Sequence, residues 1–135
     1  MLGEKLGDEQ GEVTGMRVLP SGLHGPQVEV SFRANGMFLG QQGTDVGTYT
    51  SITRPDGTMV GDGQGVVMTS DGASATWTAL GAGRFTGNGS AASWRGALIY
   101  QTMSQSLAKL NGIAVVFEFD VDENGKTTGG IWEWK

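Results

Sequence analysis

The stretch Pro55–Gly72, PDGTMVGDGQGVVMTSDG, decides the fold of this chain. It begins with Asp56-Gly57 and ends with Asp71-Gly72, dipeptides typical of tight hairpin turns because they tolerate positive φ. Between the two turns, glycine recurs at every second position, at Gly61, Gly63 and Gly65. Side chains alternate between the faces of a strand, so this spacing predicts a strand with one bare face.

The same turn signal recurs along the chain, at Asn88-Gly89 and Asn124-Gly125. Alternating apolar and polar residues between the turns predict strands joined by hairpins. The predicted strands are Glu12–Leu19, Gln27–Asn35, Thr44–Thr53, Thr58–Thr69, Ser74–Phe85, Ala91–Thr102, Ile113–Asp122 and Thr127–Lys135. One short helix is predicted over Ser104–Asn111, with Ser104 as its N-cap and Gly112 following its end.

Eight sequential antiparallel strands predict an all-β fold, an up-and-down barrel with one short helical connection. A two-sheet sandwich is the alternative, but glycines within strands favour the sharp bending that a small barrel needs. We expect one domain over residues 1–135, with residues 1–11 as a flexible N-terminal segment.

Composition excludes several functional classes. The net charge of −5 and the absence of a basic cluster argue against nucleic acid and against an anionic membrane surface as partners. There is no cysteine and only one histidine, so no metal site or cofactor is expected. The segment Asp120–Gly125 matches only the first half of a calcium loop and is interpreted as an acidic hairpin turn. No signal peptide is recognised, which leads us to expect a cytoplasmic protein.

The glycine-rich strands around Gly61–Gly65 resemble the small β-barrels of the allene-oxide-cyclase-like, or calycin-like, group and its bacterial domains of unknown function. The resemblance lies in strand pattern and glycine placement, over about Val28 to Trp134. It implies an apolar pocket inside the barrel, an oligomeric assembly, and in some members cyclisation or isomerisation of apolar substrates. No catalytic residue of that group aligns with a position in this chain.

One face of each strand should point into the barrel. The glycines on the Gly61–Gly65 face leave internal space, and aromatic side chains either fill it or line a pocket for one small ligand. The predicted ligand-binding residues are Phe32, Trp77, Trp94, Tyr100, Phe117, Trp132 and Trp134.

The strand Thr44–Thr53 can face either way. Either Val46, Thr48, Thr50 and Ile52 point inward, or Asp45, Tyr49 and Ser51 do. A carboxylate and a phenol inside an apolar barrel would form an acid/base pair with shifted pKa values. Asp45 and Tyr49 are therefore the candidate catalytic residues.

Apolar residues also alternate onto the opposite, outer face, and few charged residues accompany them. They are Val60, Val66, Met68, Leu80, Ala82, Ala97, Ile99, Ala114, Val116 and Ile131. Because a monomer rarely exposes so continuous an apolar surface, we expect it to bury this wall in a homodimer or homotrimer. The alternative is that this face is the core of a sandwich.

Three functional hypotheses follow. The chain is a barrel that binds a small apolar molecule, a cofactor-free isomerase or cyclase that uses Asp45 and Tyr49, or an oligomeric interaction protein without a ligand. Residual internal volume distinguishes the first two hypotheses from the third.

Overall fold

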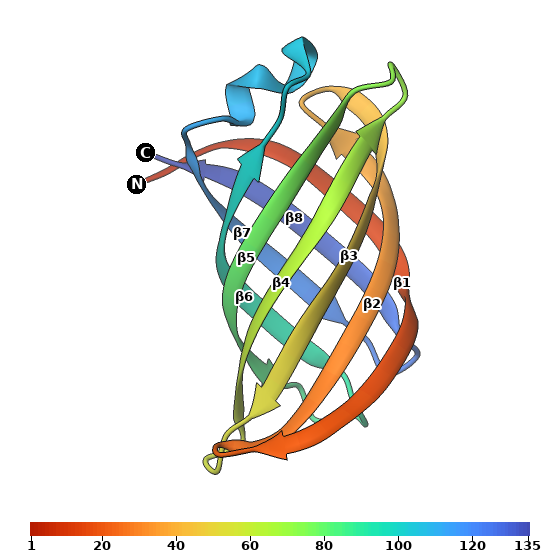
Figure 1. Cartoon of the computed structure of the whole chain (residues 1–135), viewed down its shortest axis with the longest axis vertical. Coiled ribbons are helices and arrows are strands. Elements are labelled where there is room, and N and C mark those ends of the chain that lie inside the picture. Colours follow the sequence, from red (N-terminus) through yellow and green to blue (C-terminus); the bar gives the residue numbers. More distant parts are fainter.

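A computed structural model describes all residues from 1 to 135, and its eight antiparallel strands close into one barrel in chain order (Figure 1). The prediction of an all-β, up-and-down barrel is confirmed. Its elements are β1 (Leu2–Gly22), β2 (Gly25–Phe38), β3 (Gln41–Thr53), β4 (Thr58–Thr69), β5 (Ser74–Phe85), β6 (Ala92–Gln101), the 3₁₀ helix η1 (Gln105–Leu110), β7 (Ala114–Val121) and β8 (Lys126–Trp134).

The hairpin turns form where the Asp-Gly and Asn-Gly dipeptides predict them. Gly57 and Gly125 have φ values of 86° and 79°, a conformation that side-chain-bearing residues rarely adopt. The carboxylate of Asp122 accepts backbone N–H bonds from Asn124 at 2.8 Å and from Lys126 at 2.9 Å. The acidic segment that resembles half a calcium loop is thus a hairpin turn that Asp122 itself stabilises.

The first strand is much longer than predicted. We expected residues 1–11 to be a flexible segment, but residues 2–11 lie within β1. Leu2–Glu12 pairs with β8, and Gly7–Gly22 pairs with β2. The N-terminal part of β1 therefore closes the barrel, because without it β8 would present an unpaired edge.

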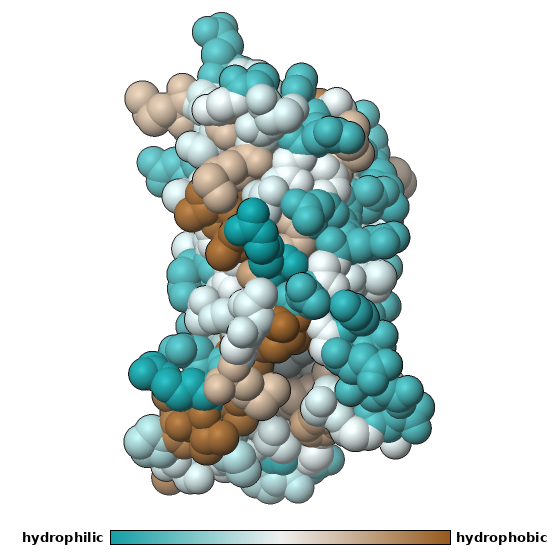
Figure 2. All heavy atoms as spheres, turned by 90° about the vertical axis from the view of Figure 1, so that its right-hand side faces the viewer, coloured by the Kyte–Doolittle hydropathy of each residue, from teal (hydrophilic) through white to brown (hydrophobic).

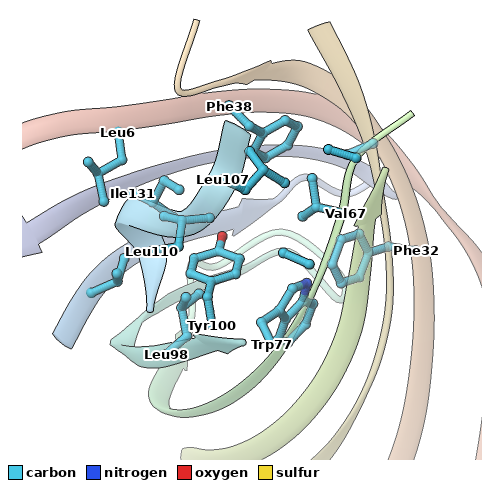
Figure 3. Packing of buried hydrophobic residues seen from close by; sticks show 14 residues of the cluster. Leu6, Phe32, Phe38, Val67, Trp77, Leu98, Tyr100, Leu107, Leu110 and Ile131 are labelled. Carbon is cyan, nitrogen blue, oxygen red and sulfur yellow. The ribbon is translucent and has the colours of Figure 1, made fainter. Parts of the chain in front are cut away.

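The predicted helix is a 3₁₀ helix, η1, that covers one end of the barrel. Its Leu107 and Leu110 are fully or almost fully buried, as side chains three residues apart lie on one face of a 3₁₀ helix. Figure 3 shows η1 lying across the cluster that contains Tyr100 and Trp77. Ser104 is the N-cap residue as predicted, but its side chain makes no capping hydrogen bond; its hydroxyl accepts the Ser74 N–H at 3.1 Å.

Aromatic side chains and glycines are matched across the strands of the barrel. Six inward-facing aromatic residues each lie directly opposite a glycine on a neighbouring strand. The pairs are Phe32 with Gly47, Tyr49 with Gly63, Trp77 with Gly65, Trp94 with Gly83, Phe117 with Gly96, and Phe119 with Gly129. The register thus places each large ring beside a position that has no side chain.

These rings occupy the space that the glycines leave. A Cβ added at Gly65 would lie 2.3 Å from Cζ2 of Trp77, and one at Gly83 would lie 2.8 Å from Cδ2 of Trp94. Such separations are far inside van der Waals contact, so both positions exclude any larger residue unless the indole moves. Much of the glycine excess is therefore a packing requirement of the barrel interior.

The outer surface is mixed in character. Figure 2 shows the side of the molecule at the right of Figure 1, where polar residues cover much of the surface and apolar residues form separate groups, the largest towards the lower end. Leu80 and Ile99, on β5 and β6, are more than half exposed. No helix in the structure has the length and apolar character that crossing a membrane requires.

Candidate functional site

A cavity of about 70 Å³ lies in the barrel; members of both clusters of buried residues line it, and it reaches the exposed Asp62 and Glu118. One water molecule needs about 10–15 Å³ on this measure, so the cavity has room for several waters or a small organic molecule. Rings and glycines form most of its wall. It is lined by Glu9, Phe32, Asp45, Tyr49, Gly61, Asp62, Gly63, Trp77, Ala79, Gly81, Trp94, Leu98, Tyr100, Phe117, Glu118, Phe119, Gly129, Gly130 and Ile131.

The orientation of β3 resolves the ambiguity in the sequence. Asp45, Tyr49 and Ser51 point inward, and Val46 is on the outer face. The structure therefore brings both candidate catalytic residues, Asp45 and Tyr49, to the wall of one cavity. They are joined there by five of the seven predicted ligand-binding residues, namely Phe32, Trp77, Trp94, Tyr100 and Phe117.

Asp45 is a buried carboxyl group held by an indole. The Trp77 Nε1–H donates a hydrogen bond of 2.8 Å to Oδ1 of Asp45. Burial raises the pKa of Asp45, and hydrogen bonds with Glu9 and Trp77 partly offset this by favouring the ionised form. Stacking of Phe32 on Trp77, with ring centroids 6.3 Å apart, holds the indole in place.

A second carboxyl group, that of Glu9, lies beside Asp45 and was not a candidate from the sequence. Its Oε2 is buried and has no hydrogen-bond partner. Burial, reinforced by the charge of Asp45, raises the pKa of Glu9 to about 10. Glu9 was missed because the strand was expected to begin at Glu12. The signal that could have found it is the alternation of Gly7, Glu9, Gly11 and Val13 on one face.

The glycine opposite Glu9 makes room for its side chain. A Cβ at Gly129 on β8 would lie 3.2 Å from Cγ of Glu9. Gly36 is the partner of Glu9 on the other flanking strand, β2. On both flanking strands, the residue directly opposite Glu9 is therefore a glycine, which has no side chain to crowd the carboxyl group.

Two tyrosines complete the polar lining. Burial raises the pKa of Tyr49 to about 12, and burial together with the charges of Asp45 and Glu9 raises the pKa of Tyr100 well above its usual value. Both phenols are therefore neutral hydrogen-bonding groups at physiological pH. The Tyr49 ring packs edge-on against Trp94 and Phe119, with ring centroids 5.6 Å and 6.0 Å away.

Two predicted ligand-binding residues, Trp132 and Trp134, lie outside the barrel. Trp134 is 59% exposed, and Lys5 Nζ lies 5.4 Å from the centroid of the Trp132 ring on the outer surface. Ile131, which was assigned to the outer wall, points inward instead and is 8% exposed. Apolar residues occupy both faces of β8, so hydrophobicity alone does not determine which face is buried.

Two carboxyl groups that share a low-dielectric space cannot easily both ionise, so one retains a proton while the other loses it. Such a pair can donate one hydrogen bond and accept others, and it can move a proton on a bound molecule. The structure has no group of three or more His, Asp or Glu side chains placed to hold a metal ion.

Comparisons with known proteins show a shared fold. No protein-family model matches the chain, and no curated protein matches it. A protein of unknown function from Clostridium acetobutylicum superposes with a TM-score of 0.83 at 13% identity, over 99% of this chain and 98% of that one. A β-barrel-like protein from Acinetobacter baumannii gives a TM-score of 0.84 at 14% identity, covering 100% of this chain and 96% of that one.

An enzyme from Penicillium herquei shares the fold as well. Its TM-score is 0.72 at 18% identity, over 96% of this chain and 92% of that one. At these identities the likeness is one of architecture, and function has to be argued from the site. The chain is thus similar in fold to barrel proteins of unknown function and to one enzyme.

Proposed function

We propose that this protein binds a small, largely apolar molecule inside its barrel. The observation that carries the proposal is an aromatic cavity of about 70 Å³ that contains the two carboxyl groups of Glu9 and Asp45. Ligand sites typically combine apolar walls with a few convergent polar groups. A buried carboxyl oxygen without a partner, Glu9 Oε2, costs stability, and a ligand that forms a hydrogen bond with it would recover that cost.

Native mass spectrometry of the protein purified from its own cells tests this proposal. We expect the folded protein to carry an additional small mass that is released on denaturation. Ala79 lines the cavity, so the variant Ala79→Leu should fill it and lose the bound mass while remaining folded. Ala82→Leu is the matched control, because Ala82 lies on the outer face of the same strand. Retention of the mass by Ala79→Leu would contradict binding in the cavity.

The second candidate is a cofactor-free isomerase or cyclase, as the resemblance to allene-oxide-cyclase-like barrels implies. The carboxyl pair favours it, because the Asp45 carboxylate can accept a proton from a substrate carbon while the Glu9 carboxyl donates one at another carbon. This assignment replaces the Asp45–Tyr49 pair with Asp45 and Glu9. Asp45→Asn should abolish turnover of the bound molecule; absence of turnover in the wild type would exclude the enzyme.

We also propose that the outer wall forms a homo-oligomer. Leu80, Ala97, Val116 and Trp132 lie in direct register on β5, β6, β7 and β8, so they form one stripe across four strands. The exposed Ile99 and Trp134 lie on the same outer face. Tryptophan and aliphatic side chains in a continuous patch are typical of subunit interfaces.

A further inference from the structure

We infer that the molecule bound in the cavity carries a protonated amine, held between the Glu9–Asp45 pair and the aromatic rings. This inference rests on the proposed binding function and specifies the polar end of the ligand. It is carried by the geometry of the cavity: two inward-facing carboxyl groups, one buried unpartnered acceptor and a wall of rings.

The charges that line the cavity favour a cation. Its acidic lining residues are Glu9, Asp45, Asp62 and Glu118, and no lysine, arginine or histidine lines it. Asp62 and Glu118 are exposed, and Glu118 pairs with Arg95 at 3.9 Å, which leaves Glu9 and Asp45 as the internal acids. An anionic ligand would meet two carboxyl groups and no positive side chain, so carboxylates and phosphates are disfavoured.

The hydrogen-bonding groups of the cavity also favour a cationic ligand. The only indole donor beside the carboxyl pair, Trp77 Nε1–H, is already bonded to Asp45 Oδ1. Once the Glu9 carboxyl has released the proton that it shares with Asp45, its Oε2, which has no other partner, can accept a hydrogen bond. An ammonium group supplies three N–H donors and no acceptor, which matches a site with surplus carboxyl oxygens. An alcohol supplies one donor and adds further acceptors.

The rings supply the remaining stabilisation. Phe32, Tyr49, Trp77, Trp94 and Phe119 lie around the cavity with centroid separations of 4.9–6.4 Å between neighbouring rings. Aromatic faces attract a cation, most strongly where it is withdrawn from water. The apolar body of the ligand would meet Leu98 and Ile131, which also line the cavity.

Amine binding must be linked to proton release. In the empty protein, burial keeps the Glu9 carboxyl protonated at neutral pH. When the ammonium enters, the carboxyl O–H bond breaks, its proton leaves for solvent, and the carboxylate pairs with the cation. The other titratable groups facing this space are Asp45 and Tyr49 on β3 and Tyr100 on β6, while Gly36 and Gly129 flank Glu9 on β2 and β8. Affinity should therefore rise with pH up to the pKa of the amine.

Isothermal titration calorimetry with three probes of similar size tests the inference: isobutylamine, isobutanol and isobutyrate. At pH 8 we expect the amine to bind at least tenfold more tightly than the alcohol, and the carboxylate not to bind. Titrations in two buffers of different ionisation enthalpy should show release of about one proton per amine. Between pH 6 and pH 8 the amine affinity should rise at least tenfold, and the alcohol affinity should not rise.

Two variants test whether the amine preference and the proton release arise at Glu9. Glu9→Gln keeps the size of the side chain but cannot release a proton, so amine preference and proton release should both be lost. Glu12→Gln is the matched control, because Glu12 lies on the same strand but is exposed and pairs with Lys126 at 3.2 Å. The pH dependence of the wild type tests the inference even if Glu9→Gln does not fold.

The outcomes separate the two proposals. An alcohol that binds as tightly as the amine, or an amine that binds without proton release, would overturn the amine inference and leave the proposed binding function standing. Failure of all three probes to bind, together with no co-purifying mass in native mass spectrometry, would overturn both.

Discussion

The Trp77 indole N–H donates to Oδ1 of Asp45 across 2.8 Å, inside the barrel and between two strands that are not adjacent, β5 and β3. The partners are 32 residues apart in the sequence, and β4 lies between them. Gly65 on that intervening strand has no side chain, which leaves the space that the Trp77 indole occupies. One glycine thus makes possible the contact that holds the Asp45 carboxyl group in place.

Removal of the indole donor should weaken the fold. Trp77→Phe keeps an aromatic ring but leaves Asp45 Oδ1 without its N–H partner, which we expect to cost about 1–3 kcal/mol of unfolding free energy. Phe85→Leu is the control, because Phe85 is 47% exposed at the end of β5 and its ring makes no hydrogen bond. Urea denaturation measures both variants. Equal losses would show that the Trp77–Asp45 bond contributes nothing specific.

The glycine opposite Trp77 should tolerate no side chain. In Gly65→Ala the new Cβ would lie 2.3 Å from Cζ2 of Trp77, so the indole must shift at a cost of about 1–3 kcal/mol. Gly15→Ala provides the comparison, because a Cβ there has no atom within 4 Å. Thermal unfolding should separate the two variants clearly, and similar stabilities would contradict the packing role of Gly65.

Much of this arrangement could be predicted from the sequence, because turn dipeptides recur between the strands and glycines alternate within them. The hairpin dipeptides set the strand ends, and the alternation of Gly61, Gly63 and Gly65 with polar residues set the inner face of β4. Trp77, Trp94, Trp132 and Trp134 were all expected to enter space left by glycines; Trp77 and Trp94 do, whereas Trp132 and Trp134 lie outside the barrel. What the sequence lacked was the register, which pairs each inward ring with one particular glycine.

The rest depended on contacts between distant parts of the chain. The sequence of β3 does not show which face points inward. Each face carries both polar residues and an apolar or aromatic residue, so either orientation, with Val46 inside or with Asp45 inside, fits the alternation. On β8, both Ile131 and Trp132 are apolar, so only pairing with β7 and β1 decides between them. Glu9 belongs to the site because closure of the barrel draws the acidic N-terminal segment into β1.

The buried carboxyl of Glu9 should make stability depend on pH. Burial raises its pKa from 4.5 to about 10, so the folded chain retains a proton that the unfolded chain releases. The stability that this group contributes is complete below pH 4.5 and is lost as the pH rises towards 10. Asp45, whose pKa burial also raises, contributes in the same direction.

Glu9→Gln should therefore be more stable than the wild type at pH 8 and equally stable at pH 4. Chemical denaturation at the two pH values measures the difference. The exposed Glu12→Gln should track the wild type at both. A constant offset between Glu9→Gln and the wild type across pH would show that Glu9 is not protonated in the folded state.

The apolar stripe on β5–β8 should hold copies of the chain together. Size-exclusion chromatography with light scattering at micromolar concentration should report a dimer or trimer, and Leu80→Asp should convert it to monomer. Leu80 is 63% exposed in the single chain, so this substitution should leave the fold intact. Val18→Asp, on the exposed β1, should leave the assembly unchanged. A wild-type monomer would exclude the interface.

The most direct test of ligand binding in the barrel is the set of four tryptophan indole N–H signals in a ¹H–¹⁵N NMR spectrum. Trp77 and Trp94 line the cavity, whereas Trp132 and Trp134 lie on the outside. The protein purified from its own cells should be compared with the same protein refolded free of small molecules. Binding in the cavity predicts that the Trp77 and Trp94 signals differ while those of Trp132 and Trp134 coincide. Identical spectra, or changes confined to the outer pair, would contradict it.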